Sequence, residues 1–417
     1  MAPETLLPSA SPVRFVAEDG TRVDQHGGYA EPGVDRLKAA YRLMVLGRRF
    51  DVQATALTKQ GRLAVYPSSA GQEACQVAAA LTLKKQDWLF PTYRDSVALI
   101  ARGLKPGEVL TLLRGDAHCG YNPAETRVAP QCTPLATQTL HAAGLAHAMQ
   151  RRGEDAVALA LIGDGATSEG DFHEALNFAA VFKAPVVFFV QNNRYAISVP
   201  FEKQSAAAAL AYKGIGYGMR SEQVDGNDAV AVLSVLDDAV RHAREGRGPV
   251  LVEAHTYRID AHTNADDATR YRDADEVAKW READPVTRLE TYLKARNTLQ
   301  DAEIEQFHQD AEDFAQTVRD TLNAEPELDP LSLFDHVYAE PTRHLKTQRA
   351  ALEADLSGVW VAEPPMDSSF CVSVPTTYRA NQSLTGPDCF GAQRTGKQRV
   401  VLASGAGRAE ALQSGAR

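Results

Sequence analysis

Short apolar runs that alternate with segments of helical periodicity constrain the fold of this 417-residue chain most strongly. Residues 156–162, 185–190 and 249–254 have the length and composition of buried strands, and 222–224 is a shorter candidate. Residues 169–182 and 229–244 have helical spacing instead. This alternation predicts an α/β fold, a doubly wound parallel sheet with helices on both faces. Ligands of such sheets bind at the carboxyl ends of the strands, so we expect the chemistry in the loops that follow them.

The remainder of the chain divides by composition. Residues 1–33 are rich in proline, glycine and polar residues, and we expect an N-terminal arm with one short strand. An apolar stripe at helical spacing, beginning at Leu37, opens the α/β domain, which we place at 34–290. Residues 291–358 are charged and helical in pattern, so we predict a helical C-terminal extension. Residues 359–417 have no clear period and are expected to be an irregular tail outside the fold.

Charge and composition argue against several classes of protein. The formal net charge is −10, whereas nucleic-acid-binding domains are usually basic. No apolar run approaches the ~20 residues that span a bilayer, and residues 1–24 lack the pattern of a signal or transit peptide. The five cysteines show neither a CxxC pair nor metal-type spacing, which favours reduced thiols. We therefore expect a soluble cytoplasmic protein that binds neither nucleic acid nor membrane.

Two motifs follow neighbouring strands of the predicted sheet. The segment GDGATSEG begins after residue 162, and QNN follows residue 190. One helix and one strand fit between them, so Asp164 and Asn193 should lie a few ångströms apart at the carboxyl edge of the sheet. A carboxylate and an amide oxygen there can share Mg²⁺, which readily takes further oxygens from a diphosphate. The glycines let backbone N–H groups approach phosphate, and the helix that begins near Glu169 directs its positive end to the same place.

Other phosphate-binding motifs fit this region poorly. Asp171 stands where a Walker loop needs lysine, and the glycines do not have dinucleotide-binding spacing. The paired motifs are the signature of thiamine diphosphate enzymes. The segments GDGATSEGDFHEALNFAAVFKAPVVFFVQNNRYAIS, GRLAVYPSSAGQEACQVAAAL, FPTYRD, TPLATQTLHAAG and YRIDAHTNADDATRYR resemble the alpha subunits of heterotetrameric 2-oxo acid dehydrogenases, the decarboxylating first component of pyruvate and branched-chain complexes. The resemblance covers roughly residues 10–355 and is strongest for the bacterial two-chain type.

The resemblance implies a metal site and a diphosphate site. In that family the acid of GDG and the second asparagine bind the metal, here Asp164 and Asn193. A backbone carbonyl two residues further on, here that of Tyr195, completes the protein ligands. The backbone at Gly165 and Ala166 would face the diphosphate of the cofactor.

The resemblance also assigns residues around the cofactor and substrate. Tyr93 and Arg94 of FPTYRD would reach the cofactor phosphates, and the fixed fork of an arginine suits phosphate oxygens. A surface arginine in a helix-start turn is the alternative for Arg94. His262 would contact the phosphates and help to handle the 2-oxo acid, which makes it the catalytic histidine.

A further segment implied to lie beside the thiamine ring contains Leu135. In some members it also holds a monovalent cation, near Thr137 and Gln138, but Cys132 stands where those members carry a hydroxyl. In mitochondrial branched-chain members a phosphorylated serine follows the histidine, and here that position is Thr263.

One part of the expected catalyst is missing from the chain. Thiamine catalysis needs a carboxylate against the pyrimidine ring, and in the family it lies on a second α/β module that this sequence lacks. The resemblance therefore implies a beta subunit, an α2β2 heterotetramer, and acyl transfer to the lipoyl group of a separate acyltransferase core. Pyruvate is the expected substrate on overall resemblance. A branched-chain 2-oxo acid, acetoin cleavage and a non-catalytic paralogue are the alternatives.

Overall fold

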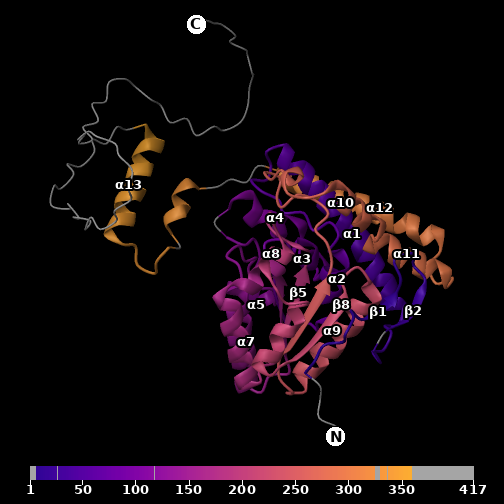
Figure 1. The fold of residues 1–417 in the computed structure, drawn as a ribbon. Coiled ribbons are helices and arrows are strands. Elements are labelled where there is room, and N and C mark those ends of the chain that lie inside the picture. Colours follow the sequence, from indigo (N-terminus) through magenta and orange to yellow (C-terminus); the bar gives the residue numbers. More distant parts are fainter. Residues whose placement is uncertain (1–5, 26, 117, 325–328, 336, 359–417) are drawn as a thin grey trace, which may run out of the picture. The chain divides into compact units, whose positions relative to one another are not determined.

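The computed structural model describes residues 6–25, 27–116, 118–324, 329–335 and 337–358. The predicted tail at 359–417 lies outside these residues. The chain forms two compact units, Met1–Glu340 and Pro341–Arg417, and the first contains the sheet (Figure 1). In the second, helix α13 spans Arg343–Ser357.

The central sheet has five parallel strands in the order β3–β4–β5–β9–β8. Their bounds are Trp88–Phe90 (β3), Ala158–Gly163 (β4), Val186–Asn192 (β5), Arg220–Asp225 (β8) and Val250–His255 (β9). The predicted parallel α/β sheet is therefore confirmed. Strand β3, which has three residues, was not predicted, because so short a run carries no periodicity.

Helices cover both faces of the sheet. They are α1 (Val34–Lys59), α2 (Glu73–Thr82), α3 (Ser96–Ala101), α6 (Thr137–Arg151), α7 (Gly170–Phe182) and α9 (Ala229–Arg244). Because successive side chains of a strand point to opposite faces, Leu159 and Phe189 pack in one core cluster with α1, α2 and α9. Ala160 and Phe188 pack in a second cluster with α6 and α7. Burial on both faces explains why the strands are apolar throughout.

The N-terminal arm and the C-terminal helices join the same core. Strands β1 (Arg14–Val16) and β2 (Arg22–Gln25) form an antiparallel pair, and Val13 bridges to Val224 at the β8 edge of the sheet. Helices α11 (Pro285–Ala295) and α12 (Asp301–Asn323) pack on α1, and α12 lies along it in Figure 1. The domain boundaries at residues 33 and 290 stay predictions, since residues on both sides of each contribute to one core.

Short elements complete the described part of the chain. They are α4 (Pro106–Arg114), α5 (Pro123–Thr126), β6 (Tyr195–Ala196), β7 (Val199–Pro200), α8 (Phe201–Gln204) and α10 (Ala274–Glu282), with 3-10 turns η1 (Asp164–Ser168), η2 (Leu210–Tyr217), η3 (Ala268–Arg270) and η4 (Pro330–Phe334). Within the described ranges, none of the helices has both the length and the apolar character needed to cross a membrane.

Candidate active site

A cavity of about 760 Å³ opens at the carboxyl ends of β4 and β5. Its wall includes every site residue predicted from the sequence, which are Tyr93, Arg94, Leu135, Asp164, Gly165, Ala166, Asn193, Tyr195 and His262. A second cavity of about 750 Å³ lies beside the edge strand β8 and the N-terminal arm, and none of these residues lines it. The predicted residues therefore meet in the cavity at the strand ends, which is where ligands bind to α/β sheets.

Three oxygen atoms converge where β4 and β5 end. Gly163 and Gln191 pair across the two strands, so Asp164 and Asn193 follow at neighbouring positions. When the Asn193 amide donates from Nδ2 to Gln72 Oε1 at 2.8 Å, its oxygen lies 3.2 Å from Asp164 Oδ1 and 3.1 Å from the Tyr195 carbonyl. Adjacent ligands of an octahedral Mg²⁺ with bonds of about 2.1 Å lie about 3.0 Å apart. The distances from the Asn193 oxygen to the other two oxygens therefore fit that ion.

Without a cation, one carboxylate oxygen of this group has no partner in the described structure. Asp164 is almost completely buried, and its Oδ2 has no hydrogen-bond partner among the residues described. Burial raises the pKa of this carboxyl to about 6. Rotation of the Asn193 amide would let it donate to Asp164 Oδ1 and to the Tyr195 carbonyl, but its oxygen would then lie 2.8 Å from Gln72 Oε1 and could accept only if the Gln72 amide rotated with it. A divalent cation would give the free carboxylate oxygen a partner, and the Asn193 amide can rotate to present its oxygen to that cation.

The turn after β4 presents backbone to the cavity. Gly165 cannot be replaced without a clash, because an added Cβ would lie 2.8 Å from the Cβ of Ala196. Lys213 Nζ donates to the Thr167 carbonyl at 2.7 Å, and Gln204 Nε2 donates to the Asp164 carbonyl, so the turn is held from two sides. Helix α7 begins at Gly170, directly after this turn. Backbone N–H groups and the positive end of the helix together favour an anion here.

Arg94 and His262 lie in contact with each other on the cavity wall, where the arginine is charged and the histidine is neutral. Arg94 is only 6% exposed, so the surface-arginine alternative is wrong. Its Nη1 donates to the Ser68 carbonyl at 2.9 Å, and its Nη2 lies 3.1 Å from His262 Nδ1. Since a guanidinium only donates, Nδ1 accepts and the imidazole hydrogen belongs to Nε2. Burial and the charges of Arg94 and Arg258 lower the pKa of His262 to about 4, so it is neutral at pH 7.

Comparison with known proteins settles the family. The model of the dehydrogenase E1 component family matches residues 41–330. The chain belongs to the dehydrogenase E1 component family. It is 46% identical over 346 residues to the 3-methyl-2-oxobutanoate dehydrogenase subunit alpha of Mycobacterium tuberculosis, covering 83% of this chain and 94% of that one.

Pyruvate dehydrogenase relatives are also similar. The chain is 37% identical to the pyruvate dehydrogenase E1 component subunit alpha of Acholeplasma laidlawii over 78% of its length and 95% of the relative. The corresponding subunit of Bacillus subtilis is 37% identical over 75% of this chain and 85% of its own length. This E1 family depends on thiamine diphosphate, which agrees with a cavity that joins a cation site to an anion site.

Several residues that contact the site in this E1-family chain were not predicted. Arg258 donates to the Tyr195 carbonyl at 3.2 Å and to the Ile197 carbonyl at 2.7 Å, and so fixes the turn that carries one proposed metal ligand. Gln72 contacts Asn193. Both lie inside the segments that carried the resemblance, but neither has a spacing that marks it. Gln138 and Thr263, which the sequence left open, also line the cavity.

Gln72 should select the orientation in which Asn193 can bind a metal. In the orientation in which the Asn193 oxygen faces Asp164, Gln72 Oε1 accepts from Asn193 Nδ2, and Gln72 Nε2 has no partner in the described structure. We expect Gln72→Met, which lacks the acceptor, to weaken Mg²⁺ binding roughly 10- to 100-fold, as outer-shell partners of metal ligands do. Gln72→Glu keeps the acceptor and should bind Mg²⁺ no more weakly. Calorimetric titration of Mg²⁺ at saturating thiamine diphosphate measures both, and equal affinity in Gln72→Met would contradict this role.

Proposed function

We propose that this chain is the alpha subunit of a 2-oxo acid dehydrogenase that decarboxylates a 2-oxo acid and transfers the acyl group to a lipoyl group of an acyltransferase component. One observation carries the proposal. In a chain of the E1 family, a buried carboxylate with an unused oxygen, an amide oxygen and a carbonyl converge at the strand ends, in the same cavity as the Arg94–His262 pair.

The proposed cofactors are thiamine diphosphate and Mg²⁺. Asp164, Asn193 and the Tyr195 carbonyl would hold the metal, and the turn at Gly165 and Ala166, with Tyr93 and Arg94, would hold the phosphates. When bound, thiamine diphosphate supplies the electron sink for loss of CO₂. Arg94 is held before an anion binds, because its guanidinium donates to the carbonyls of Ser68 and His262, and Lys213 holds the turn at the Thr167 carbonyl.

His262 is proposed to hold a hydrogen at Nε2 and donate it toward the 2-oxo acid. Its Nδ1 is engaged by Arg94, and the ring of Tyr93 lies 6.0 Å away, edge to face, which orients the imidazole. We expect His262→Ala to leave a folded, cofactor-binding protein whose lipoamide acylation is roughly 100-fold slower or more. Thr263→Glu should also inactivate, because it adds a negative charge beside the phosphate site.

The measurement is acylation rate together with cofactor affinity for both variants. His173→Ala is the matched control, since that histidine contacts the Tyr217 hydroxyl and does not line the cavity. Thr263→Ser should keep its activity. Near-normal turnover in both His262→Ala and Thr263→Glu would show that this loop is not at the reacting atoms.

A beta subunit in an α2β2 tetramer is the proposed partner. Apolar side chains that are at least one third exposed gather at the cavity wall, and they are Val65, Leu135, Ile197 and Val199. Exposed apolar surface beside a site marks a place where another chain docks. The relatives are named as alpha subunits, which agrees with this arrangement. The proposed location is the cytoplasm, where the free Cys75, Cys119 and Cys132 would stay reduced.

Pyruvate is the first candidate substrate, as overall resemblance predicted. A branched-chain 2-oxo acid is the second, and the 46% identity to a 3-methyl-2-oxobutanoate dehydrogenase subunit favours it. Assays of the reconstituted pair of subunits on pyruvate and on 3-methyl-2-oxobutanoate decide between them. Turnover of acetoin alone would place the chain with the acetoin-cleaving enzymes, and failure to bind thiamine diphosphate would identify a non-catalytic paralogue.

A further inference from the structure

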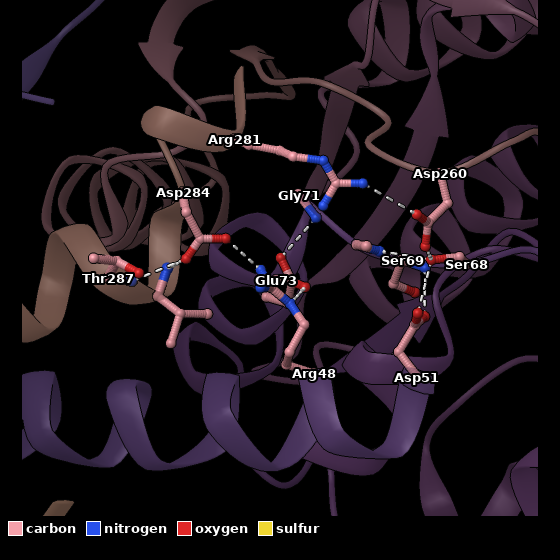
Figure 2. Close-up of polar contacts among 12 residues, drawn as sticks. Arg48, Asp51, Ser68, Ser69, Gly71, Glu73, Asp260, Arg281, Asp284 and Thr287 are labelled. Atoms are coloured by element: carbon pink, nitrogen blue, oxygen red, sulfur yellow. Dashed lines mark hydrogen bonds and ion pairs between the residues drawn. The ribbon is translucent and has the colours of Figure 1, made fainter. Parts of the chain in front are cut away.

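A carboxyl group outside the proposed chemistry lies completely buried beneath the active-site wall. Asp51 of α1 is 2% exposed, and it contacts the segment 66–72 that forms part of that wall (Figure 2). Its Oδ1 accepts from the Ser69 N–H at 2.6 Å and from the Tyr66 hydroxyl at 2.9 Å. Its Oδ2 lies 2.7 Å from the Ser68 hydroxyl. None of these contacts is with a cation, which is unusual for a buried carboxylate.

The Ser68 hydroxyl connects Asp51 to a second carboxyl group. Ser68 Oγ also lies 2.7 Å from Oδ2 of Asp260, so it stands between the two acids, as Figure 2 shows. A serine hydroxyl has one hydrogen and can donate to only one of them. The other contact of 2.7 Å between oxygens needs a hydrogen of its own, and only a carboxyl group can supply it. One of the two acids is therefore protonated in this arrangement.

Asp51 is the acid that keeps the proton. Asp260 has 45% of its side chain exposed and lies 3.9 Å from the Arg281 guanidinium, so its carboxyl group has both water and a cation nearby. Asp51 has neither, and burial raises its pKa to about 6, with the charge of Glu73 on α2 acting in the same direction. Its Oδ1 accepts two hydrogens, as the carbonyl oxygen of an acid does, which leaves Oδ2 as the hydroxyl.

The nearby arginines are engaged elsewhere. Arg48, on the same helix as Asp51, is paired with Glu73 of α2 and with Asp284, the residue before α11. Arg94 donates to the Ser68 carbonyl and to His262. Neither arginine has a hydrogen bond to Asp51 among the described residues. Figure 2 shows the Arg48–Glu73 and Asp51–Ser68 groups side by side as separate sets of contacts.

The Asp51–Ser68 contact lies directly under the histidine loop, residues 257–267. Asp260 belongs to this loop, two positions before His262. The segment 66–72 holds the loop at further points, since the Tyr66 N–H donates to Asn264 Oδ1 at 3.1 Å. The same segment accepts from Arg94 at the Ser68 carbonyl. Asp51 therefore reaches both members of the Arg94–His262 pair through one serine.

We propose that Asp51 is a positioning residue: while it is protonated it donates its hydrogen to Ser68, which lets Ser68 donate to Asp260 and hold the histidine loop in place, and when it ionises this hold is lost. The effect of Asp51 on catalysis rests on the proposed function, because it acts through His262. The hydrogen bonds from Asp51 through Ser68 to Asp260 do not depend on that function.

The hydrogen-bond chain makes the order of the histidine loop depend on pH. Below about pH 6 Asp51 keeps its proton, and both contacts of Ser68 are hydrogen bonds. As pH rises through that value Asp51 ionises, so two carboxylates compete for one serine hydrogen and Asp260, the exposed one, separates. Two neighbouring groups on the loop do not change charge in this range, because the pKa of His262 is lowered to about 4 and that of Asp266 lies below its ordinary value.

Hydrogen exchange of the histidine loop tests the proposal. The full chain is co-purified with its beta subunit, freed of cofactor, and its exchange is measured by mass spectrometry from pH 5.5 to 8.5 with correction for intrinsic rates. In the unsubstituted protein we expect loop exchange to accelerate roughly tenfold over and above the intrinsic change, the effect of one lost hydrogen bond. Asp51→Asn, whose amide donates at all pH values, should keep the slow exchange throughout. Ser68→Ala should exchange rapidly at every pH.

Asp310→Asn is the matched control, because its carboxylate pairs with Arg42 on the outer side of α1 and should leave the loop unchanged. Fast exchange in Asp51→Asn at all pH values would mean that Asp51 only accepts, and would overturn the proposal. A flat pH profile in the unsubstituted protein would overturn it as well. Because exchange needs neither cofactor nor substrate, a failure of the proposed enzymatic function would leave this result readable.

Discussion

Replacement of Asp164 by alanine is expected to abolish Mg²⁺-dependent binding of thiamine diphosphate without unfolding the chain. Asp164 is the only proposed metal ligand with a negative charge, and its Oδ2 has no other partner in the described structure. Loss of a direct ligand should exceed the 10- to 100-fold that outer-shell substitutions cost, so we expect affinity to fall by more than roughly 100-fold. The amide of Asn193 would then have no carboxylate beside it to complete a cation site.

Removal of the Asp164 charge should not lower the stability of the cofactor-free chain. Burial raises the pKa of Asp164 from its ordinary 3.8 to about 6, so the folded chain must hold an unfavourable charge once pH exceeds these values. A carboxyl pKa that is higher in the folded state makes stability fall as pH rises from about 4 to 6. A shift of this size corresponds to about 3 kcal/mol at pH 7. Asp164→Asn keeps the shape and removes the charge, so it should unfold at a higher temperature than the original chain at pH 7 but not at pH 4.

Calorimetric titration with thiamine diphosphate and Mg²⁺, in the presence of the beta subunit, measures the loss of affinity. Thermal unfolding of the cofactor-free protein at both pH values measures the gain in stability. Asp171→Ala is the control, because that carboxylate directly follows the motif but does not line the cavity. Unchanged affinity in Asp164→Ala would rule out the metal assignment, and lower stability of Asp164→Asn would rule out the buried charge as the cause.

The sequence predicted the site residues that directly follow a strand. Strands β4 and β5 are apolar because both their faces are covered, so their ends could be placed, and with them Asp164 and Asn193. Strand β8 was predicted as 222–224 and spans Arg220–Asp225, because its first residues are polar and break the apolar run. Strands β4 and β5 were expected to be neighbours in the sheet, which brings the two motifs together, and they are paired in the structure.

Residues that act across long separations could not be predicted. Asp51 and Asp260 are brought to one serine by the packing of α1 against the histidine loop. Gln72 meets Asn193 only because α2 begins beside the end of β5. Such contacts leave no periodicity or spacing in one sequence, whereas a motif at a strand end does. For the same reason the burial of Arg94 was not visible, although its role at the phosphates was expected from the resemblance.

The alpha chain by itself is expected to show no decarboxylation. Three carboxylates of the described residues line the cavity, and each is unsuited to act on the pyrimidine ring of thiamine. Asp164 belongs to the metal site, and Asp95 is held by Gln191 at 2.7 Å and by Thr92. Glu169 is exposed, so water would stabilise it as well as a ring nitrogen could. We therefore expect the carboxylate that thiamine catalysis needs to come from the proposed beta subunit.

The partner should also close the cavity against water, which strengthens every charged contact inside it. Without the partner, the apolar residues at the wall, such as Leu135 and Ile197, stay exposed, and the isolated chain should tend to aggregate. The test is decarboxylation of a 2-oxo acid with an artificial electron acceptor, Mg²⁺ and thiamine diphosphate, first with the alpha chain and then with the pair. We expect a rate at the background level for the chain alone and turnover for the pair. Comparable rates without the beta subunit would place the missing carboxylate in this chain, and Glu169→Gln would then be the variant to abolish it.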